Sequence, residues 1–254
     1  ATEADYTPVV EVSNDGGLTW TTATNATIPA GQTEVQARVK TTDDDTDEVV
    51  EEFTLTADIT SGNTTNTSST GTATILDNDG TPEIVISDSS VNEEDGLLTF
   101  VVSLSNPSDQ TITVVYTTAD GTAIAGSDYV STSETITFAP GETSKTITVA
   151  VLDDNVFEQP ESMYVNLTDP TNATIADDQG EGRIYDTDVP SLSVSNTEAV
   201  EGQYEIFHIQ LSNPSDEDVT FDLTPNEGSA TEADYTPVVE VSNDGGLTWT
   251  TATN

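Results

Sequence analysis

Acidic side chains recur in this sequence at the spacing Asp-Asp-x-x-x-Glu-x-x-Glu. The two copies are Asp43, Asp44, Glu48 and Glu51, and then Asp153, Asp154, Glu158 and Glu161. Ca²⁺ takes about 6–8 oxygen ligands, mostly from carboxylates and backbone carbonyls, and it tolerates irregular loops. The chemistry that this spacing favours is therefore the binding of a cation.

Further acids stand at matching points around these two sets, and we take them as candidate calcium ligands as well. They are Asp5, Asp77 and Asp79 with the first set, Glu93, Glu94, Asp128, Asp186 and Asp188 with the second, and Glu201 and Asp234 in a third, partial copy. Which of Glu93 and Glu94 is the ligand stays open, because this region has one residue more than Val200-Glu-Gly202. Mg²⁺ fits less well because it prefers a strict octahedron, and zinc is not expected with no cysteine and a single histidine, His208.

The alternative is that these acids are solvated loop charges of a salt-adapted protein. The chain has 47 acidic and 4 basic residues, a formal charge of −43. This charge excludes electrostatic binding to nucleic acid or to an anionic membrane, since both would be repelled. The placement of the acids at matching points of both copies favours calcium over the solvated-surface interpretation.

The elements that must position these acids are β-strands. Apolar residues alternate in short runs such as Thr146–Val151, which is the period of a half-buried strand. Between residues 81 and 189 we predict seven strands, separated by turn sequences such as Ser-Asn-Pro-Ser, over 83–87, 98–105, 112–118, 135–138, 144–152, 162–168 and 182–185. The fold class predicted is all-β, with tandem antiparallel Ig-like sandwiches of about seven strands each.

Internal repeats divide the chain. Residues 1–25 recur unchanged at 230–254, and Leu104-Ser-Asn-Pro-Ser108 recurs at Leu211–Ser215. We therefore expect a complete sandwich over 81–189, the C-terminal portion of a repeat over 1–80, and the N-terminal portion of the same repeat type over 190–254. The sequence begins and ends within domains, as an excised fragment would.

These motifs resemble those of the Calx-beta family. The resemblance is carried by Asp-Tyr, then Pro-Gly-Glu-Thr-Ser-Lys-Thr-Ile-Thr-Val, then the acidic run Asp153–Glu161, and then a closing Ile-x-Asp-x-Asp. The partial copies, with Ser13–Trp20, resemble the variant found in the extender regions of giant bacterial repeats-in-toxin (RTX) adhesins. The resemblance implies a calcium cluster at one end of each sandwich, with the acids named above at the ligand positions.

The function expected from this resemblance is a calcium-stabilised spacer of an extracellular, cell-surface adhesin involved in cell adhesion and biofilm formation. The spacer would project a distal binding region from the cell and be anchored through parts of the parent chain outside this segment. One alternative is a calcium-sensing regulatory module, as in sodium/calcium exchangers. A non-enzymatic carbohydrate-binding repeat is another, with Trp20 and Trp249 as a sugar platform, although a hairpin turn leading into a strand is the favoured reading of that segment.

No catalytic constellation is recognised, so an enzyme is not expected. His208 lies in an alternating strand pattern, and no serine lies in a G-x-S-x-G elbow. No run approaches the roughly 18 apolar residues of a membrane span. The partners expected are neighbouring repeats of the same chain. For the partial repeats three outcomes stay open: those of neighbouring molecules complement each other head to tail, these ends fray, or the sequence is one window of a longer continuous filament.

Overall fold

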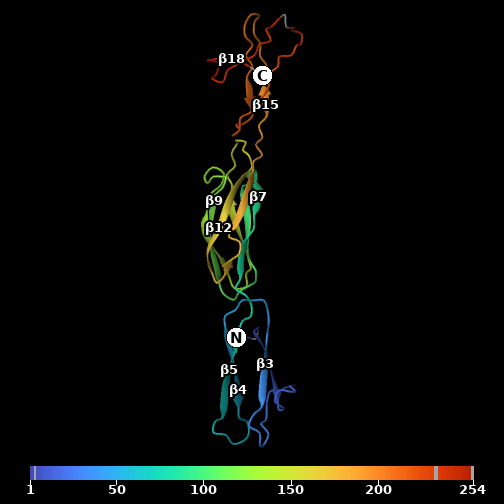
Figure 1. Ribbon diagram of the computed structural model, residues 1–254, viewed down its shortest axis with the longest axis vertical. Helices are drawn as coiled ribbons and strands as arrows, with labels where there is room; N and C mark the ends of the chain where they lie inside the picture. Colours follow the sequence, from blue (N-terminus) through green and yellow to red (C-terminus); the bar gives the residue numbers. More distant parts are fainter. Residues whose placement is uncertain (3, 232–233, 253–254) are drawn as a thin grey trace. The chain divides into compact units, whose positions relative to one another are not determined.

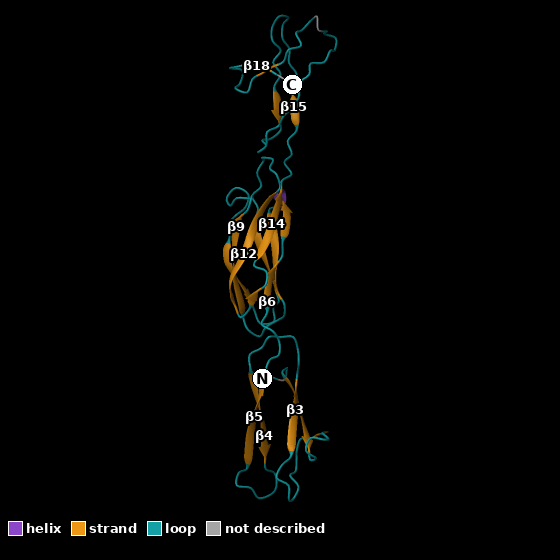
Figure 2. Cartoon of the chain, viewed as in Figure 1, coloured by secondary structure: helices purple, strands orange, loops and turns teal. Residues whose placement is uncertain are grey.

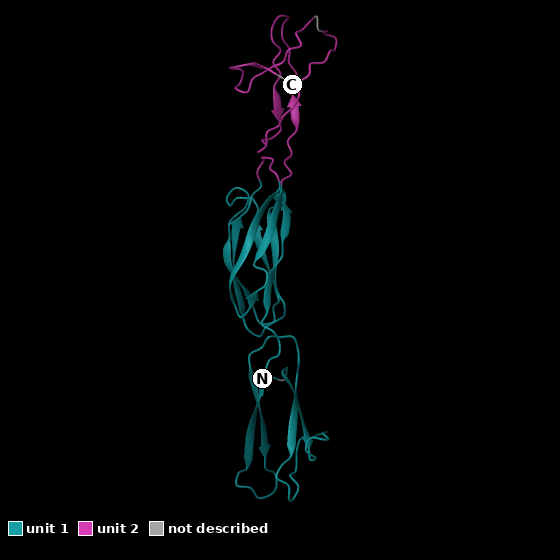
Figure 3. Cartoon of the chain, in the orientation of Figure 1, with its two compact units in different colours: residues 1–153, 160–185 teal, residues 154–159, 186–254 magenta. Residues whose placement is uncertain are grey.

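The computed structural model describes residues 1–254 except residues 3, 232–233 and 253–254, and strands make up nearly all of its regular structure (Figure 2). Its contacts divide the chain into two compact units, Ala1–Asp153 with Pro160–Tyr185, and Asp154–Gln159 with Asp186–Asn254 (Figure 3). Among the described residues the only helical segment is the short 3₁₀ turn η1, Glu93–Asp95, and no helix is long and apolar enough to cross a membrane. The all-β prediction is confirmed.

The complete sandwich of unit 1 has two sheets (Figure 1). The five-stranded sheet has the order β10-β9-β12-β14-β7, with bounds Ser133–Phe138, Ile112–Asp120, Glu161–Thr171, Gln179–Tyr185 and Ser89–Asn92. The four-stranded sheet has the order β11-β8-β6-β13, with bounds Ser144–Ala150, Leu97–Leu104, Glu83–Ile86 and Thr174–Ile175. All seven strands expected from the alternating pattern are present.

Two short strands were not expected from the sequence. β7 continues the first strand after a break at Ser87 and Asp88, and it pairs in parallel with β14 in the other sheet. β13 likewise pairs in parallel with β6. Neither shows a period-2 pattern, because β7 contains a single apolar residue, Val91, and β13 is only two residues long.

The core of this sandwich follows from the alternation. Along β8 every second side chain is buried, and Leu98, Phe100 and Val102 are fully covered. They meet the inward face of β12, where Met163 and Val165 are also fully buried. Burial of a large apolar side chain contributes about 1.5–3 kcal/mol, so this core stabilises the complete sandwich and holds the strand ends that carry the acids.

Residues 1–80 of unit 1 form two small sheets. One has the order β2-β1-β3, with bounds Thr21–Thr22, Tyr6–Ser13 and Gln36–Thr41. The other pairs β4, Glu51–Asp58, with β5, Ser68–Ile75. The Thr-rich stretch Asn63–Thr72 contains the first part of β5, where its threonines pair across the hairpin with the threonines of β4, as in the 2.8 Å contact of the Thr56 and Thr70 hydroxyls.

The segment Ser13–Trp20 is a closed turn between β1 and β2. The carboxylate of Asp15 accepts hydrogen bonds from the Thr19 amide at 2.9 Å and from the Ser13 hydroxyl at 2.7 Å. These and the Thr19 hydroxyl lower the pKa of Asp15 to about 2. The Trp20 indole donates to the Gly17 carbonyl at 3.1 Å, and Arg38 lies 4.2 Å from its ring centroid, so that ring face is covered.

In unit 2 the described residues include four short strands in two pairs. β15, Leu192–Val194, pairs with β16, Ile209–Leu211, and β17, Glu240–Val241, pairs with β18, Thr250–Thr251. The turn that precedes β18 repeats the bonds of its copy near the N-terminus, with Asp244 accepting from the Thr248 amide at 2.9 Å. His208 lies beside β16, and its carbonyl accepts from the Ser195 amide at 2.9 Å.

Candidate calcium site

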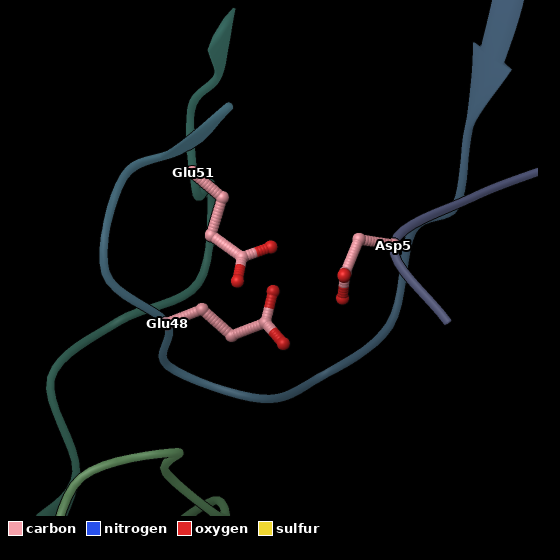
Figure 4. Close-up of side chains that lie close together, drawn as sticks. All are labelled: Asp5, Glu48 and Glu51. Carbon is pink, nitrogen blue, oxygen red and sulfur yellow. The ribbon is translucent and has the colours of Figure 1, made fainter. Parts of the chain in front are cut away.

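Three carboxylates of residues 1–80 converge in unit 1 (Figure 4). Asp5, Glu48 and Glu51 each offer one oxygen, and these oxygens lie within 4.8 Å of one another. All three side chains are half-buried. Like charges at such separations repel by about 4 kcal/mol at a partly shielded surface. A cation held between them would turn this repulsion into attraction.

The backbone fixes where these three side chains start. Asp5 precedes β1, and its carbonyl accepts from the Thr42 amide at 2.9 Å, which joins it to the end of β3. Glu51 is the first residue of β4. The Glu48 amide donates to the Asp77 carboxylate at 3.2 Å, which ties the acidic loop to the segment after β5. The site is therefore built from the ends of three strands.

The charge on Glu48 is disfavoured in this environment. Burial raises its pKa, and the nearby charges of Asp5, Asp44 and Glu51 raise it further. Asp5 is affected in the opposite direction, because hydrogen bonds from the Thr2 amide and hydroxyl lower its pKa. The cluster therefore holds more negative charge than its surroundings compensate.

Glu51 supplies the test of whether a cation fits. Its Oε2 atom is buried and has no hydrogen-bond partner, while the Ala1 ammonium lies 3.6 Å from Oε1. A buried carboxylate oxygen without a partner is costly unless a cation or proton neutralises it. The donors of the cluster are oxygens only, which is the donor set that Ca²⁺ prefers. The residues present thus fit a calcium ion.

The other predicted ligands of the first set surround this cluster. A hollow next to it is lined by Asp5, Asp44, Glu48, Asp77 and Asp79. Burial raises the pKa of Asp79, and Asp77 is the strongest of the acidic neighbours that add to this effect. Asp43 is exposed and accepts from the Asn78 side-chain amide at 3.1 Å. All seven acids predicted for this copy therefore lie in this hollow or beside it.

In the complete sandwich, unit 1 holds part of the second set. Asp128 and Glu161 each offer an oxygen, and these lie within 4.8 Å of one another. The Asp128 carbonyl accepts a hydrogen bond from the Leu152 amide at 2.9 Å. This bond places the exposed Asp153, the next residue in the chain, near Asp128. Glu93 is buried in η1, whereas Glu94 is exposed, so burial distinguishes the two glutamates that the sequence left equivalent.

The remaining acids of the second set belong to unit 2. The Glu158 amide donates to the Asp186 carboxylate, and the Asp188 amide donates to the same carboxylate at 2.6 Å. Asp154 accepts from the Val156 amide at 2.6 Å. The first set shows the same bonds, from Glu48 to Asp77 and from Thr46 to Asp44. The Asp-Asp-x-x-x-Glu spacing therefore encodes one loop conformation in both copies.

The third, partial copy is not gathered into a cluster. Glu201 and Asp234 are both exposed, and neither belongs to a group of three close carboxylates in the described part of the chain. Asp234 instead accepts from the Thr231 amide at 2.9 Å, which lowers its pKa. Residues 190–254 contain no acidic run of the Asp-Asp-x-x-x-Glu type, so these two residues lack the loop that closes the other clusters.

Sequence reasoning missed two features near the sites. Asp120, at the end of β9, accepts from the Tyr129 hydroxyl at 2.6 Å, which lowers the pKa of Asp120. The Ser-Asn-Pro-Ser segment was recognised only as a turn, yet Ser108 is buried and its hydroxyl donates to the Asp47 carboxylate at 2.9 Å. The recurrence of this segment one repeat apart was the available signal for such a contact.

Parts of this chain are similar to a known family and to known proteins. A family model described as the Calx-beta domain matches residues 22–81 and 77–188. Sodium/calcium exchanger 1 of Canis lupus familiaris is 44% identical over 70 residues, which is 28% of this chain and 7% of that protein. Sodium/calcium exchanger 2 of Rattus norvegicus is 42% identical over 72 residues, 28% of this chain and 8% of that protein. The chain thus spans less than a tenth of the length of these relatives.

Solved structures give similar matches. The apo form of the Calx CBD1 domain has a TM-score of 0.41 and 27% identity, covering 43% of this chain and 100% of that chain. The calcium-binding domain CBD12 of CALX1.1 has a TM-score of 0.41 and 26% identity, covering 47% of this chain and 53% of that chain. The two matched stretches of the family model together span residues 22–188, well over half of the sequence.

Proposed function

This chain belongs to the Calx-beta family, and from that premise we propose that its repeats form a calcium-stiffened structural spacer of a large bacterial surface adhesin of the RTX type. Ca²⁺ is the ion that these domains take, and the converging carboxylates of residues 1–80 are suited to it. The role proposed is mechanical and non-enzymatic.

The observation that carries the spacer proposal is a joint that occurs twice. In unit 1 the Asp47 amide of the first acidic loop donates to the Pro107 carbonyl at 3.0 Å, and the Asp109 amide returns a bond to the Asp47 carbonyl at 3.0 Å. In unit 2 Phe157, at the equivalent position, makes the same pair of bonds with Pro214 and Asp216, both at 3.0 Å. An acidic loop thus pairs with the following Ser-Asn-Pro-Ser turn in each case.

A second bond reinforces each joint. The side-chain amide of Asn106 donates to the Gly80 carbonyl at 2.9 Å, and that of Asn213 donates to the Asp188 carbonyl at 2.5 Å. Gly80 directly follows the acidic linker Asp77–Asp79, and Asp188 is the last acid of the linker that begins at Asp186. A module that contacts only its neighbours through a repeated joint behaves as a quasi-one-dimensional array.

Calcium would act on this joint through the loop that forms it. Of the proposed ligands, Glu48 directly follows Asp47 in this loop, and Glu51 is the first residue of β4, where the loop ends. Neutralising their charges would hold the loop in the conformation that pairs with the next repeat. Where calcium is scarce, mutual repulsion of the carboxylates would loosen the joint, which suits export before extension outside the cell.

The spacer proposal is tested by measuring the distance distribution across the first joint. Spin labels at Thr54 and Thr137, both in unit 1, would be compared in EDTA and in millimolar calcium by pulsed dipolar spectroscopy. We expect a broad distribution that narrows with calcium, and we expect Asn106→Ala to keep it broad while Ser131→Ala, at an exposed serine outside the joint, does not. Equal widths with and without calcium would refute the mechanical role.

Similarity to exchangers supports a second candidate, a calcium-sensing regulatory module. Calcium affinity separates the two roles, because sensors bind at about 10⁻⁷–10⁻⁵ M and extracellular modules at about 10⁻⁴–10⁻³ M. Isothermal titration of the whole chain with calcium gives this constant directly. Dissociation constants near the submicromolar range would favour the sensor over the spacer.

A further inference from the structure

We infer that the central sandwich, which is the complete sandwich of unit 1, binds neutral polysaccharide on the outward face of its five-stranded sheet. The ligand class is a chain of uncharged hexoses, and Tyr164 of β12 is the residue on which a sugar ring stacks. This binding goes beyond the spacer role and does not involve the calcium cluster. It rests on the register of the sheet and on the side chains that this register brings together.

The alternation along β12 places Tyr164 in the middle of the outward face. Met163 and Val165 on either side of it are fully buried, whereas Tyr164 is half-buried. It pairs with Ala119 of β9 on one side and with Glu181 of β14 on the other. Residues that pair across strands point to the same face of a sheet. One flank of the tyrosine is therefore occupied only by the methyl group of an alanine.

Polar side chains lie before and after Tyr164 along the strands. In one direction Asn166 pairs with Gln179, and the Asn166 side-chain carbonyl accepts from the Gln179 side-chain amide at 2.8 Å. In the other direction Ser162 pairs with Arg183. Each of these rows is two residues from the tyrosine, or about 6.8 Å at the rise of a strand. The aromatic ring thus lies between a row of amides and a row that carries a guanidinium group.

The charges on this face neutralise each other. Nε and Nη2 of Arg183 donate to Oε1 and Oε2 of Glu181 at 3.2 and 3.4 Å, a forked ion pair. These five strands all lie in the described part of the chain, and no other outward residue of their paired positions is charged. In a chain with a formal charge of −43, the outward side chains of these pairs therefore carry no net charge.

This charge distribution selects an uncharged ligand. A polyanion is repelled by the chain as a whole, and a polycation is attracted to the acidic loops instead of this face. A neutral ligand is neither repelled by the chain nor drawn to those loops. Of the ligands with no charge, the one that fits must have both an apolar surface for the tyrosine and polar groups for the rows beside it.

A hexose has both kinds of group. Its hydroxyls donate and accept hydrogen bonds, and its ring presents C–H groups on a face that can stack on an aromatic ring. The amide pair and the Glu181–Arg183 pair each contain donors and acceptors, and each pair is already held in place by its internal bonds. Such preorganisation lowers the entropic cost of binding. Tyr185, 38% exposed, adds a second aromatic ring two residues beyond Arg183 on the same face.

The four-stranded sheet of the same sandwich provides an internal comparison. Its two longest strands, β8 and β11, present only hydroxyl and aliphatic side chains outward, and neither an aromatic ring nor an amide is among them. They are Leu97, Thr99, Val101, Ser103, Ser144, Thr146, Thr148 and Ala150. Binding is therefore expected on one face of the sandwich only.

The test is a titration of the ¹⁵N-labelled full chain, in millimolar calcium, followed by nuclear magnetic resonance. The probes are cellohexaose, maltohexaose and mannohexaose, with polygalacturonate as the anionic comparison. We expect at least one neutral hexasaccharide to cause saturable shifts of amides in β9, β12 and β14 and none in β8 and β11. No saturable shift with any of the three, shifts centred on Trp20 or Trp249, or equal shifts with polygalacturonate would overturn the inference.

Variants identify the stacking residue. Tyr164→Ala removes the ring and should weaken binding at least about tenfold, whereas Tyr164→Phe keeps the ring and should bind like wild type. Ala119→Gln leaves the tyrosine in place, fills its flank and should also weaken binding, so the test does not depend on the folding of one variant. Thr148→Ala on the opposite face is the control. Unchanged binding in both Tyr164→Ala and Ala119→Gln would remove Tyr164 from the site.

Discussion

At the residue scale, the carboxylates of Asp5, Glu48 and Glu51 lie so close together that their like charges repel. Glu51 has a buried oxygen without a hydrogen bond, and Glu48 has a pKa raised by burial and by its acidic neighbours. Side chains in such surroundings are suited to binding a cation, since attraction to the ion offsets the free-energy cost of burying their charges. Two predictions follow from these two residues.

The first concerns Glu51→Gln, which keeps the shape of the side chain and removes its charge. We expect calcium affinity at this cluster to fall at least about tenfold, because a carboxylate–cation attraction of about 4 kcal/mol at 4 Å exceeds the 1.4 kcal/mol that a factor of ten represents. Isothermal titration would measure this change. Glu52→Gln, on the exposed neighbouring position of β4, is the control and should leave the affinity unchanged.

The second concerns pH. Because the folded-state pKa of Glu48 is raised, the folded protein binds its proton more tightly than the unfolded chain does. In EDTA the contribution of Glu48 to stability is therefore full below its unfolded pKa and is lost as pH rises through the folded pKa. Thermal melts of wild type and Glu48→Gln across this range should converge at low pH and diverge at neutral pH, with the variant more stable there. Parallel curves would contradict the assignment.

At the element scale the alternation of apolar residues was enough to predict the seven main strands. It did not predict β7, which has a single apolar residue, or the two-residue β13, and both pair in parallel with strands distant in sequence. The recurring spacing of acids identified the loops that bring Asp5, Glu48 and Glu51 together. It could not distinguish Glu93 from Glu94, because burial in a 3₁₀ turn depends on how the surrounding strands pack.

One prediction belongs to the packing of these elements. A Cβ atom at Gly121 would lie 2.3 Å from the Ser162 carbonyl, whose backbone cannot move without disturbing β12. We expect Gly121→Ala to destabilise the central sandwich by about 1–3 kcal/mol, the usual cost of overpacking. Gly228→Ala, at the matching position of residues 190–254 with nothing within 4 Å, is the control. Equal unfolding midpoints in denaturant titration would refute this packing argument.

At the scale of the whole molecule the dominant fact is the formal charge of −43. Composition alone left a salt-adapted acidic protein as an alternative, whereas the matching placement of the acids in two repeats and the convergence of three of them in space favour ligands over solvated charges. Screening by salt acts on both kinds of charge, with a Debye length of about 8 Å at 0.15 M. Stabilisation that is specific for calcium at constant ionic strength separates the two explanations.

The most direct test of the calcium account is calorimetric melting of the whole chain in EDTA, in millimolar calcium, and in magnesium at equal ionic strength. Each independent site saturated at 100 times its dissociation constant adds about 2.7 kcal/mol to stability. We therefore predict a rise of the unfolding midpoint by tens of degrees with calcium and a much smaller rise with magnesium. An equal rise with both ions, or no rise, would contradict specific calcium binding. These acids would then be explained as solvated surface charges.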